Sequence, residues 1–319
     1  MRLRCLVVLV LLAAIALTTG ARAESGMNGQ RSEYAPITLS VACGGQLRSV
    51  CGKVVPRIAT ETAKAGVVLK PVGSGLAVDT AAAVCDGQTA AAIVQRDAVA
   101  LIAHQPACLG RYDFVGRPLY PFYAFLVVKA GAPFHQFNDM ANDGRRHVIM
   151  AGAEGTSGQI TLGFLLRSNP FMQRTVVAAL GDLDVGLERV ANGSIDGFFS
   201  LESLDSDMID RVRLKTDAHG KPLYAFLDIY PMPEFFRMGD GAGHCLYRLT
   251  ALDFGGATPV TTVSVDAVML LARGFRDGHA KGGPRASDAL ASAIDAAEPA
   301  ILAEMRSQGD WRPAGTSCQ

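Results

Sequence analysis

The chain has 319 residues, of which 30 are basic and 30 acidic, so it carries no formal net charge. Without a basic excess, neither nucleic acid nor an anionic membrane surface is expected as its main partner. Hydrophobic residues make up 49% and charged residues 19%, which is typical of a well-packed globular protein and excludes a disordered one.

The N-terminal residues have the pattern of a cleavable export signal. Arg2 and Arg4 precede an apolar run, Cys5 to Leu17, that is shorter than a membrane span, and Ala21-Arg22-Ala23 fits a small-x-small cleavage site. We therefore expect a signal peptide over residues 1–23, a flexible leader over residues 24–34 and a periplasmic location. Removing Arg2, Arg4 and Arg22 leaves 30 − 3 = 27 basic residues against 30 acidic ones, a net charge of −3.

Six cysteines follow the predicted signal peptide: Cys43, Cys51, Cys85, Cys108, Cys245 and Cys318. An even number in an exported chain indicates disulfides. Cys85 and Cys108 flank one strand-containing unit and are predicted to pair, which leaves Cys43 with Cys51 and Cys245 with Cys318 by elimination. Free buried thiols are the alternative. No CxxC motif is present, so neither thioredoxin-like redox chemistry nor a zinc ribbon is indicated.

In the first part of the chain, predicted strands alternate with predicted helices. The strands span residues 37–42, 67–72 and 90–94, and the helices span residues 47–58, 77–85 and 98–104. Pro56 could kink the first of these helices. This order implies a parallel sheet covered by helices, and such sheets bind ligands beyond the carboxyl ends of their strands. Three predicted turns meet at that edge: Cys43 to Gln46, Gly73-Ser74-Gly75 and Gln95-Arg96-Asp97.

The second part repeats this organisation. A long aromatic strand at residues 120–128 is followed by a strand at 148–150, a glycine loop at 151–158 and a helix that starts near Ile160. A helix at residues 184–192 and a strand at 195–199 come next. Residues 215–256 are rich in proline and glycine, so hairpins and loops are expected there. A buried strand at 260–271 precedes a closing helix, capped by Ser287 and divided by Pro299. Two similar α/β lobes around a shared cleft are the simplest architecture.

The glycine loop at residues 151–158 is the most informative segment. A strand, a glycine-rich loop and a helix start leave backbone N–H groups unpaired at the helix N-terminus. With the helix dipole and the hydroxyls of Thr156 and Ser157, these groups favour a bound anion or carboxylate. The same residues are also typical of an ordinary capped turn.

The order of several motifs resembles the TAXI family of TRAP-transporter solute receptors, which are periplasmic binding proteins of the type 2 fold. Ala42-Cys-Gly-Gly45 is similar to the family's small-x-GG turn, and Val72-Gly-Ser-Gly75 to its second-strand turn. Residues 87–97 (GQTAAAIVQRD), 151–157 (AGAEGTS) and 192–199 (NGSIDGFF) are similar to three further family motifs. The chain departs from the pattern at Leu47-Arg48, at Arg96 and in its six cysteines.

The resemblance implies a two-lobed α/β protein whose ligand cleft lies between mostly parallel sheets flanked by helices. Lobe 1 would comprise residues 35–124 and 264–319, and lobe 2 residues 125–263. The implied protein is a monomer that captures a small anionic or carboxylate-bearing molecule by hinge closure. It would deliver this ligand to an integral-membrane permease of the TRAP type.

The candidate ligand-binding residues lie in the glycine turns and around the first crossing between the lobes. They are Gly44, Gly45, Gln46, Gly73, Ser74, Gly75, Gln95, Arg96, Asp97, Tyr123, Gly155, Thr156, Ser157 and Phe199. Arg96 could bind a carboxylate through two hydrogen bonds, or it could pair with Asp97. The aromatic residues are equally suited to core packing, and the hydroxyl residues to helix capping.

No sequence motif indicates catalysis or a cofactor. GxSxG, HExxH and a Walker loop are all missing, and the six histidines are scattered without metal-ligand spacing. We therefore expect a binding protein that is not an enzyme and holds no metal. The alternatives are a receptor of the same fold that serves a sensor or another transporter, including one for an apolar ligand, and a periplasmic enzyme or metal carrier.

Overall fold

A computed structural model describes residues 36–44, 50–255, 258–278 and 283–307, all of which belong to one unit of the chain. The predicted signal peptide and leader lie outside the described residues, as do Gly45, Gln46 and Cys318.

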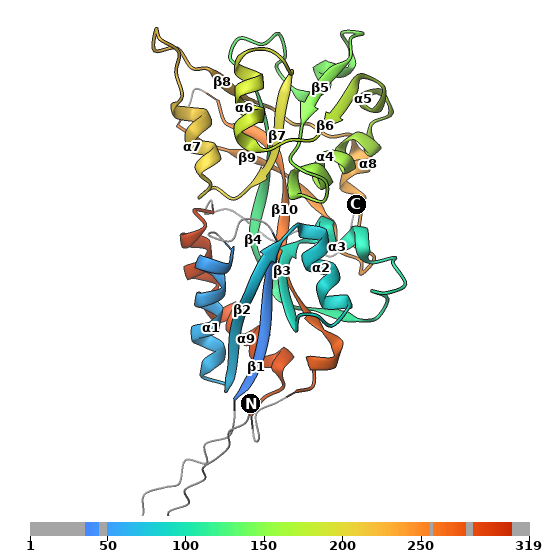
Figure 1. Ribbon diagram of the computed structural model, residues 1–319, viewed down its shortest axis with the longest axis vertical. Helices are drawn as coiled ribbons and strands as arrows, with labels where there is room; N and C mark the ends of the chain where they lie inside the picture. Colours follow the sequence, from blue (N-terminus) through green and yellow to red (C-terminus); the bar gives the residue numbers. More distant parts are fainter. Residues whose placement is uncertain (1–35, 45–49, 256–257, 279–282, 308–319) are drawn as a thin grey trace, which may run out of the picture. The chain divides into compact units, whose positions relative to one another are not determined.

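Ten strands of the described residues form one mixed sheet in the order β2-β1-β3-β10-β4-β7-β5-β6, with β8 paired to β4 and β9 paired to β10 (Figure 1). Their bounds are Ile37–Gly44 (β1), Val67–Gly75 (β2), Ala91–Gln95 (β3), Tyr112–Lys129 (β4), His147–Met150 (β5), Val176–Ala179 (β6), Gly197–Glu202 (β7), Tyr224–Leu227 (β8), Tyr247–Leu252 (β9) and Val260–Ala272 (β10).

The pairing of these strands repeats itself in the two halves of the sheet. Strand β1 is parallel to β2 and β3, and β5 is parallel to β6 and β7. Each parallel set is completed by an antiparallel strand, β10 against β3 and β4 against β7. We call the part built on β1, β2 and β3 lobe 1, and the part built on β5, β6 and β7 lobe 2.

The long antiparallel strands β4 and β10 connect the two lobes (Figure 1). Tyr123 of β4 is the last residue paired with β10, opposite Ser264, and the first paired with β7, opposite Glu202. Strand β4 starts at Tyr112, well before the predicted strand at residues 120–128, because residues 112–115 also pair with β10 across a register shift. The lobe boundaries after residues 124 and 263 stay a prediction.

Helices cover both faces of the sheet. The main helices are α1 (Val55–Ala63), α2 (Ala77–Cys85), α3 (Arg96–Ile102), α4 (Ser157–Ser168), α5 (Pro170–Thr175), α6 (Leu183–Ala191), α7 (Asp207–Leu214), α8 (Pro233–Phe236) and α9 (Ala286–Glu304). Three further helical segments span Val50–Val54 (η1), Phe137–Ala141 (η2) and Arg273–Phe275 (η3). The largest core cluster runs along one sheet face through both lobes, with side chains from α1, α4 and α9. A second cluster packs α2 and α3 on the other face of lobe 1, and a third packs α6 and α7 in lobe 2.

Two predictions near the start of the chain were wrong. Cys43 belongs to β1 rather than to a turn, because it pairs with both Ser74 and Ile93. Pro56 stands at the start of α1, where no backbone N–H is needed, and does not kink the helix.

The closing helix α9 differs from its prediction at both named residues. It runs through Pro299 without a break, since Leu290, Ile294 and Ile301 are buried along its core face. Its N-cap is Arg285 rather than Ser287. Backbone carbonyls of the preceding loop accept the N–H groups of Ala286 (2.7 Å) and Ser287 (3.3 Å), so a hydroxyl cap is not required.

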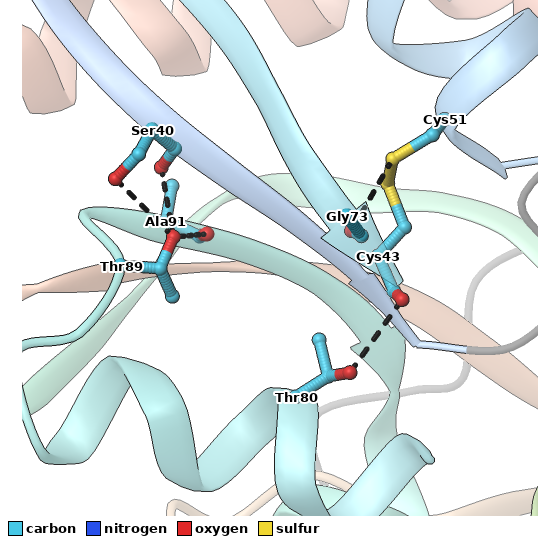
Figure 2. Close-up of a disulfide and its surroundings, with 7 residues drawn as sticks. All are labelled: Ser40, Cys43, Cys51, Gly73, Thr80, Thr89 and Ala91. Atoms are coloured by element: carbon cyan, nitrogen blue, oxygen red, sulfur yellow. Dashed lines mark hydrogen bonds between the residues drawn. A yellow bond between two sulfur atoms is a disulfide. The ribbon is translucent and has the colours of Figure 1, made fainter. Parts of the chain in front are cut away.

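Two disulfides link described cysteines: Cys43–Cys51 and Cys85–Cys108, which are two of the predicted pairings. Cys245 is also disulfide-bonded. Figure 2 shows the first bridge between the end of β1 and η1, where the Cys51 sulfur lies 3.9 Å from the carbonyl oxygen of Gly73. This is a contact rather than a hydrogen bond, because a disulfide sulfur carries no proton.

The proline- and glycine-rich segment at residues 215–256 contributes β8, α8 and β9 between loops, so two of its segments join the main sheet.

Among the described residues, no helix has both the length and the apolar character needed to cross a membrane.

Candidate functional site

A cavity of about 770 Å³ lies between the two lobes. Lobe 1 and β4 contribute Val50, Gly75, Leu76, Ala77 and Phe122 to its lining. Lobe 2 contributes Ala151, Gly152, Ala153, Thr156, Ser157, Gly158, Leu180, Gly181, Asp182, Leu183, Phe198, Phe199, Ser200, Leu201, Glu202 and Ser203. The lining is largely apolar. Among its described residues, Asp182 and Glu202 have ionisable side chains, and none is lysine, arginine or histidine.

Two helix N-termini from different lobes reach this cavity. Helix α2 starts at Ala77 and helix α4 starts at Ser157, and neither has a side-chain hydrogen bond to cap it. The Thr156 hydroxyl donates instead to the carbonyl oxygens of Ala151 (3.3 Å) and Ala153 (2.7 Å). The first-turn N–H groups and the positive ends of both helix dipoles therefore remain available to an acceptor in the cavity.

Glu202 supplies the other polar feature of the lining. It is buried at the end of β7 and accepts a hydrogen bond from the Ser200 hydroxyl at 2.5 Å. Burial raises the pKa of the Glu202 carboxyl, and the nearby carboxylate of Asp205 raises it further. Glu202 therefore holds its proton to a higher pH than an exposed glutamate, which reduces its repulsion of a bound carboxylate.

Of the predicted ligand-binding residues, Gly75, Thr156, Ser157 and Phe199 line the cavity. Gly155 is not among the lining residues, but it precedes Thr156 with φ +78°, and an added Cβ there would lie 3.3 Å from the lining residue Leu76 of lobe 1. This position therefore requires glycine both for its backbone conformation and for the close approach of the lobes.

Several predicted residues lie elsewhere. An added Cβ at Gly44 would approach Val94 to 2.9 Å, so Gly44 permits close packing of β1. Gly73, with φ +132°, and Ser74 belong to β2 beside β1, and Tyr123 faces the core cluster of lobe 2. Neither Gly73 nor Tyr123 is among the lining residues.

Sequence reasoning missed most of the lobe 2 wall. Leu180 and Asp182 follow β6, a strand that was not predicted, and Ser200 to Ser203 lie beyond the predicted end of the strand at residues 195–199. Both segments stand at carboxyl ends of parallel strands. Had β6 been found from the short apolar run of Val176–Ala179, the rule that ligands bind at such ends would have identified them.

Polar contacts join the lobes on both sides of the cavity. Lys53 of η1 and Asp205 of lobe 2 form an ion pair at 2.7 Å, in which the Asp205 side chain is only 3% exposed. Asp97 of α3 accepts hydrogen bonds from the hydroxyls of Thr161 in α4 (2.6 Å) and Tyr247 in β9 (2.9 Å). The predicted site residue Asp97 thus links the lobes and does not line the cavity.

Asp97 should make the stability of the protein depend on pH. Burial raises the pKa of its carboxyl from 3.8 to about 6, against the lowering effect of its hydrogen bonds. Between these two values the folded protein retains a proton that the unfolded chain has lost, so stability falls as the pH rises from about 4 to 6. The expected loss is about 3 kcal/mol. It is measured as the difference in unfolding free energy between the wild type and Asp97→Asn across pH 4 to 7.5.

The carboxyl group of Asp139 should make stability depend on pH in the opposite direction, so it serves as a comparison for Asp97. Burial acts to raise the pKa of its carboxyl, but hydrogen bonds from the backbone N–H groups of His135 and Gln136 hold that pKa below the ordinary value. Its contribution to stability is present above the unfolded pKa and is lost as the pH falls. A difference between wild type and Asp97→Asn that does not change with pH would contradict the role assigned to Asp97.

Arg96, the predicted anion contact, is buried in a different environment. Its Nη1 lies 2.8 Å from Oδ2 of Asp240, and the two side chains are 5% and 0% exposed. The guanidinium carbon also lies 5.3 Å from the centre of the Phe114 ring. The pairing with Asp97 that the sequence left open is replaced by this ion pair, and Arg96 is not among the lining residues.

Comparisons with known proteins identify the fold of the chain, but they identify no sequence family. No protein-family model matches the sequence, and no curated protein matches it. Solved structures do match. The chain has the two-lobed α/β fold of type 2 periplasmic binding proteins.

Three structures illustrate this likeness. A "probable amino-acid ABC transporter extracellular-binding protein" from Bacillus subtilis is 8% identical, with a TM-score of 0.51 over 86% of this chain and 99% of that one. A Streptococcus mutans structure from a description of glutathione import through a cystine ABC importer is 12% identical, with a TM-score of 0.50 over 85% and 95%. A Xanthomonas citri protein bound to ATP is 12% identical, with a TM-score of 0.50 over 86% and 90%. The predicted fold class is confirmed.

Among the described residues, no group of three or more histidine, cysteine, aspartate or glutamate side chains is arranged to hold a metal ion.

Proposed function

We propose that the protein is an exported solute-binding protein that captures a small carboxylate-bearing molecule between its lobes. The observation that carries this proposal is the cavity between the uncapped N-termini of α2 and α4, one from each lobe. A carboxylate placed there would accept N–H groups from both lobes at once, so it would favour the closed arrangement. The apolar walls favour a ligand with an apolar body behind the carboxylate.

Delivery to a membrane transporter is the role that this mechanism suits, and the likeness to the TAXI family favours a permease of the TRAP type. Hinge motion would occur where β4 leaves β10 for β7, near the boundaries after residues 124 and 263. The Lys53–Asp205 ion pair would then form on closure.

A purely apolar ligand is the second candidate. It is favoured by the apolar lining and by the lack of a basic side chain among the described lining residues. Matched pairs of probes distinguish the two candidates in a thermal-shift experiment: hexanoate against hexanol, and phenylacetate against 2-phenylethanol. Carboxylate recognition predicts that only the acids raise the melting temperature, whereas an apolar site predicts a shift from both members.

A variant tests the helix N-terminus directly. Thr156→Asp places a carboxylate at the N-cap of α4, where it would accept the free N–H groups itself and repel an anionic ligand. We expect a small rise in stability without ligand, of about 1 kcal/mol, and loss of the shift caused by the acids. Met232→Asp adds the same charge at the uncapped N-terminus of α8, away from the lining, and should leave the shift intact. The proposal fails if neither acid shifts the wild type, or if Thr156→Asp binds the acids as well as Met232→Asp does.

A further inference from the structure

Two polar side chains lie on one row of the sheet, where the strands pass from one lobe to the other. Gln95, the last residue of β3, is paired with Ala267 of β10, and Ala267 is paired with Tyr120 of β4. Because residues directly opposite each other point to the same face, Gln95 and Tyr120 share a face with Ala267 between them. Phe122, two residues further along β4, points to that face too.

Neither polar side chain has a partner in the described part of the protein. Gln95 and Tyr120 are 0% exposed. The amide nitrogen and oxygen of Gln95 and the hydroxyl of Tyr120 make no hydrogen bond with any described residue. Such groups destabilise the fold when they are buried unpaired, so their presence calls for a function. Tyr247 is also buried, but its hydroxyl donates to Asp97.

Of the two side chains, Tyr120 lies directly behind the cavity wall. The ring of Tyr120 packs against that of Phe122, with 5.1 Å between their centres, and Phe122 lines the cavity. Burial raises the pKa of the Tyr120 hydroxyl well above its ordinary value, and the carboxylate of Asp205, two residues from the lining residue Ser203, raises it further. Tyr120 therefore packs against the cavity wall at Phe122 and is affected by the charge of Asp205 in lobe 2.

We propose that Gln95 and Tyr120 form a polar inner end of the cavity and bind a neutral hydroxyl or carboxamide group of the ligand. This inference rests on the proposed function. The Gln95 amide offers a donor and an acceptor, and the Tyr120 hydroxyl offers one of each. A hydroxyl or carboxamide matches both, whereas a second carboxylate would be repelled by Asp205 and would leave the Gln95 oxygen unpaired. The Phe122 ring must turn aside to admit the group.

The ligand should therefore bind in a single orientation. Its carboxylate faces the N-termini of α2 and α4, its apolar middle contacts residues such as Phe199 and Leu201, and its neutral polar end reaches Gln95 and Tyr120. A hydroxylated carboxylic acid should consequently bind more tightly than the same acid without its hydroxyl.

Two pairs of probes test this directly: phenylacetate with 4-hydroxyphenylacetate, and hexanoate with 6-hydroxyhexanoate. In calorimetric titrations of the full chain, at least one hydroxylated acid should bind the wild type about tenfold more tightly than its partner, as expected for one well-made hydrogen bond. Tyr120→Phe and Gln95→Met should remove this preference, and neither should lower the melting temperature of the ligand-free protein, because each removes an unpaired buried polar group.

Tyr247→Phe is the matched control, since it removes a buried hydroxyl that has a partner. It should lower the melting temperature and keep the preference for the hydroxylated acid. If the acids bind the wild type without any preference, or if Tyr120→Phe and Gln95→Met keep it, the inference is overturned while the proposed function stands. It is also overturned if these two variants are destabilised as much as Tyr247→Phe, because their polar groups would then be satisfied within the protein. Failure of every acid to bind the wild type would contradict the proposed function itself, and the inference with it.

Discussion

Replacing Arg96 with methionine should lower the free energy of unfolding by about 3 kcal/mol, because it leaves a buried carboxylate without its cation. Asp240 is 0% exposed in its side chain and lies 2.8 Å from Arg96. Burial alone would raise the pKa of Asp240, but the backbone N–H groups of His244 and Ala242, together with the Arg96 guanidinium, hold it below the ordinary value. Asp240 keeps these backbone hydrogen bonds in the variant, so the loss should be at the lower end of the range for broken buried pairs.

Urea denaturation of three variants measures this effect. Arg57→Met serves as the control, because Arg57 and Glu304 form an ion pair at 2.8 Å whose side chains are 51% and 31% exposed. Its loss should cost less than about 1 kcal/mol. Adding Asp240→Asn to Arg96→Met removes the stranded charge and should restore part of the stability. A loss in Arg96→Met no larger than that in Arg57→Met would show that the pair is not buried in solution.

Removing either disulfide should lower the free energy of unfolding by an amount similar to that of Arg96→Met. Only the loss of Cys43–Cys51 should also affect the cavity between the lobes. The Cys85–Cys108 bridge closes a loop with a sequence separation of 23, and the Cys43–Cys51 bridge one of 8. Loop-closure entropy then predicts losses of about 3.5 and about 2.5 kcal/mol for the two double alanine variants. The larger loss belongs to the bridge between the end of α2 and the segment after α3.

The effects on binding should follow the opposite order. Cys51 belongs to η1, which also carries the lining residue Val50 and the ion-paired Lys53. Without its bridge, η1 is no longer tied to the end of β1 beside Gly73 (Figure 2). Cys43→Ala/Cys51→Ala should therefore weaken the binding of hexanoate or phenylacetate, and Cys85→Ala/Cys108→Ala should not. Equal affinities in the two double variants, measured by calorimetry, would disprove the positioning role of the first bridge.

The sequence predicted the repeated α/β architecture because its periodic signals are local. The strands around Val41, Ile93 and Met150 are short apolar runs next to turn residues, a pattern that is consistent with buried parallel strands. Strand β6 escaped detection because it has only four residues, and its partly exposed side chains carry no clear alternation. The first eight residues of β4 were missed because Gly116 and Pro118 interrupt their pattern, although β10 pairs with part of them.

The candidate site was less predictable because it depends on pairs that are distant in the sequence. Thr156 and Ser157 could be proposed from the loop that contains them, and they do line the cavity. For Arg96 the sequence offered an anionic ligand or the neighbouring Asp97 as partner, and nothing local reveals that Asp240 would approach it from the segment before β9. Tertiary pairing of this kind decides whether a charged residue meets a ligand or another residue.

The place of β10 in the sheet has a consequence for the way the protein folds. Strand β10 lies between β3 and β4, although both precede it by a long stretch of chain. While the polypeptide is being made from its N-terminus, the edges of β3 and β4 stay open until β10 has emerged. An unpaired strand edge is prone to join another chain, so the nascent protein should need protection from aggregation until then. Truncation before Val260 should consequently produce aggregates rather than a stable first lobe.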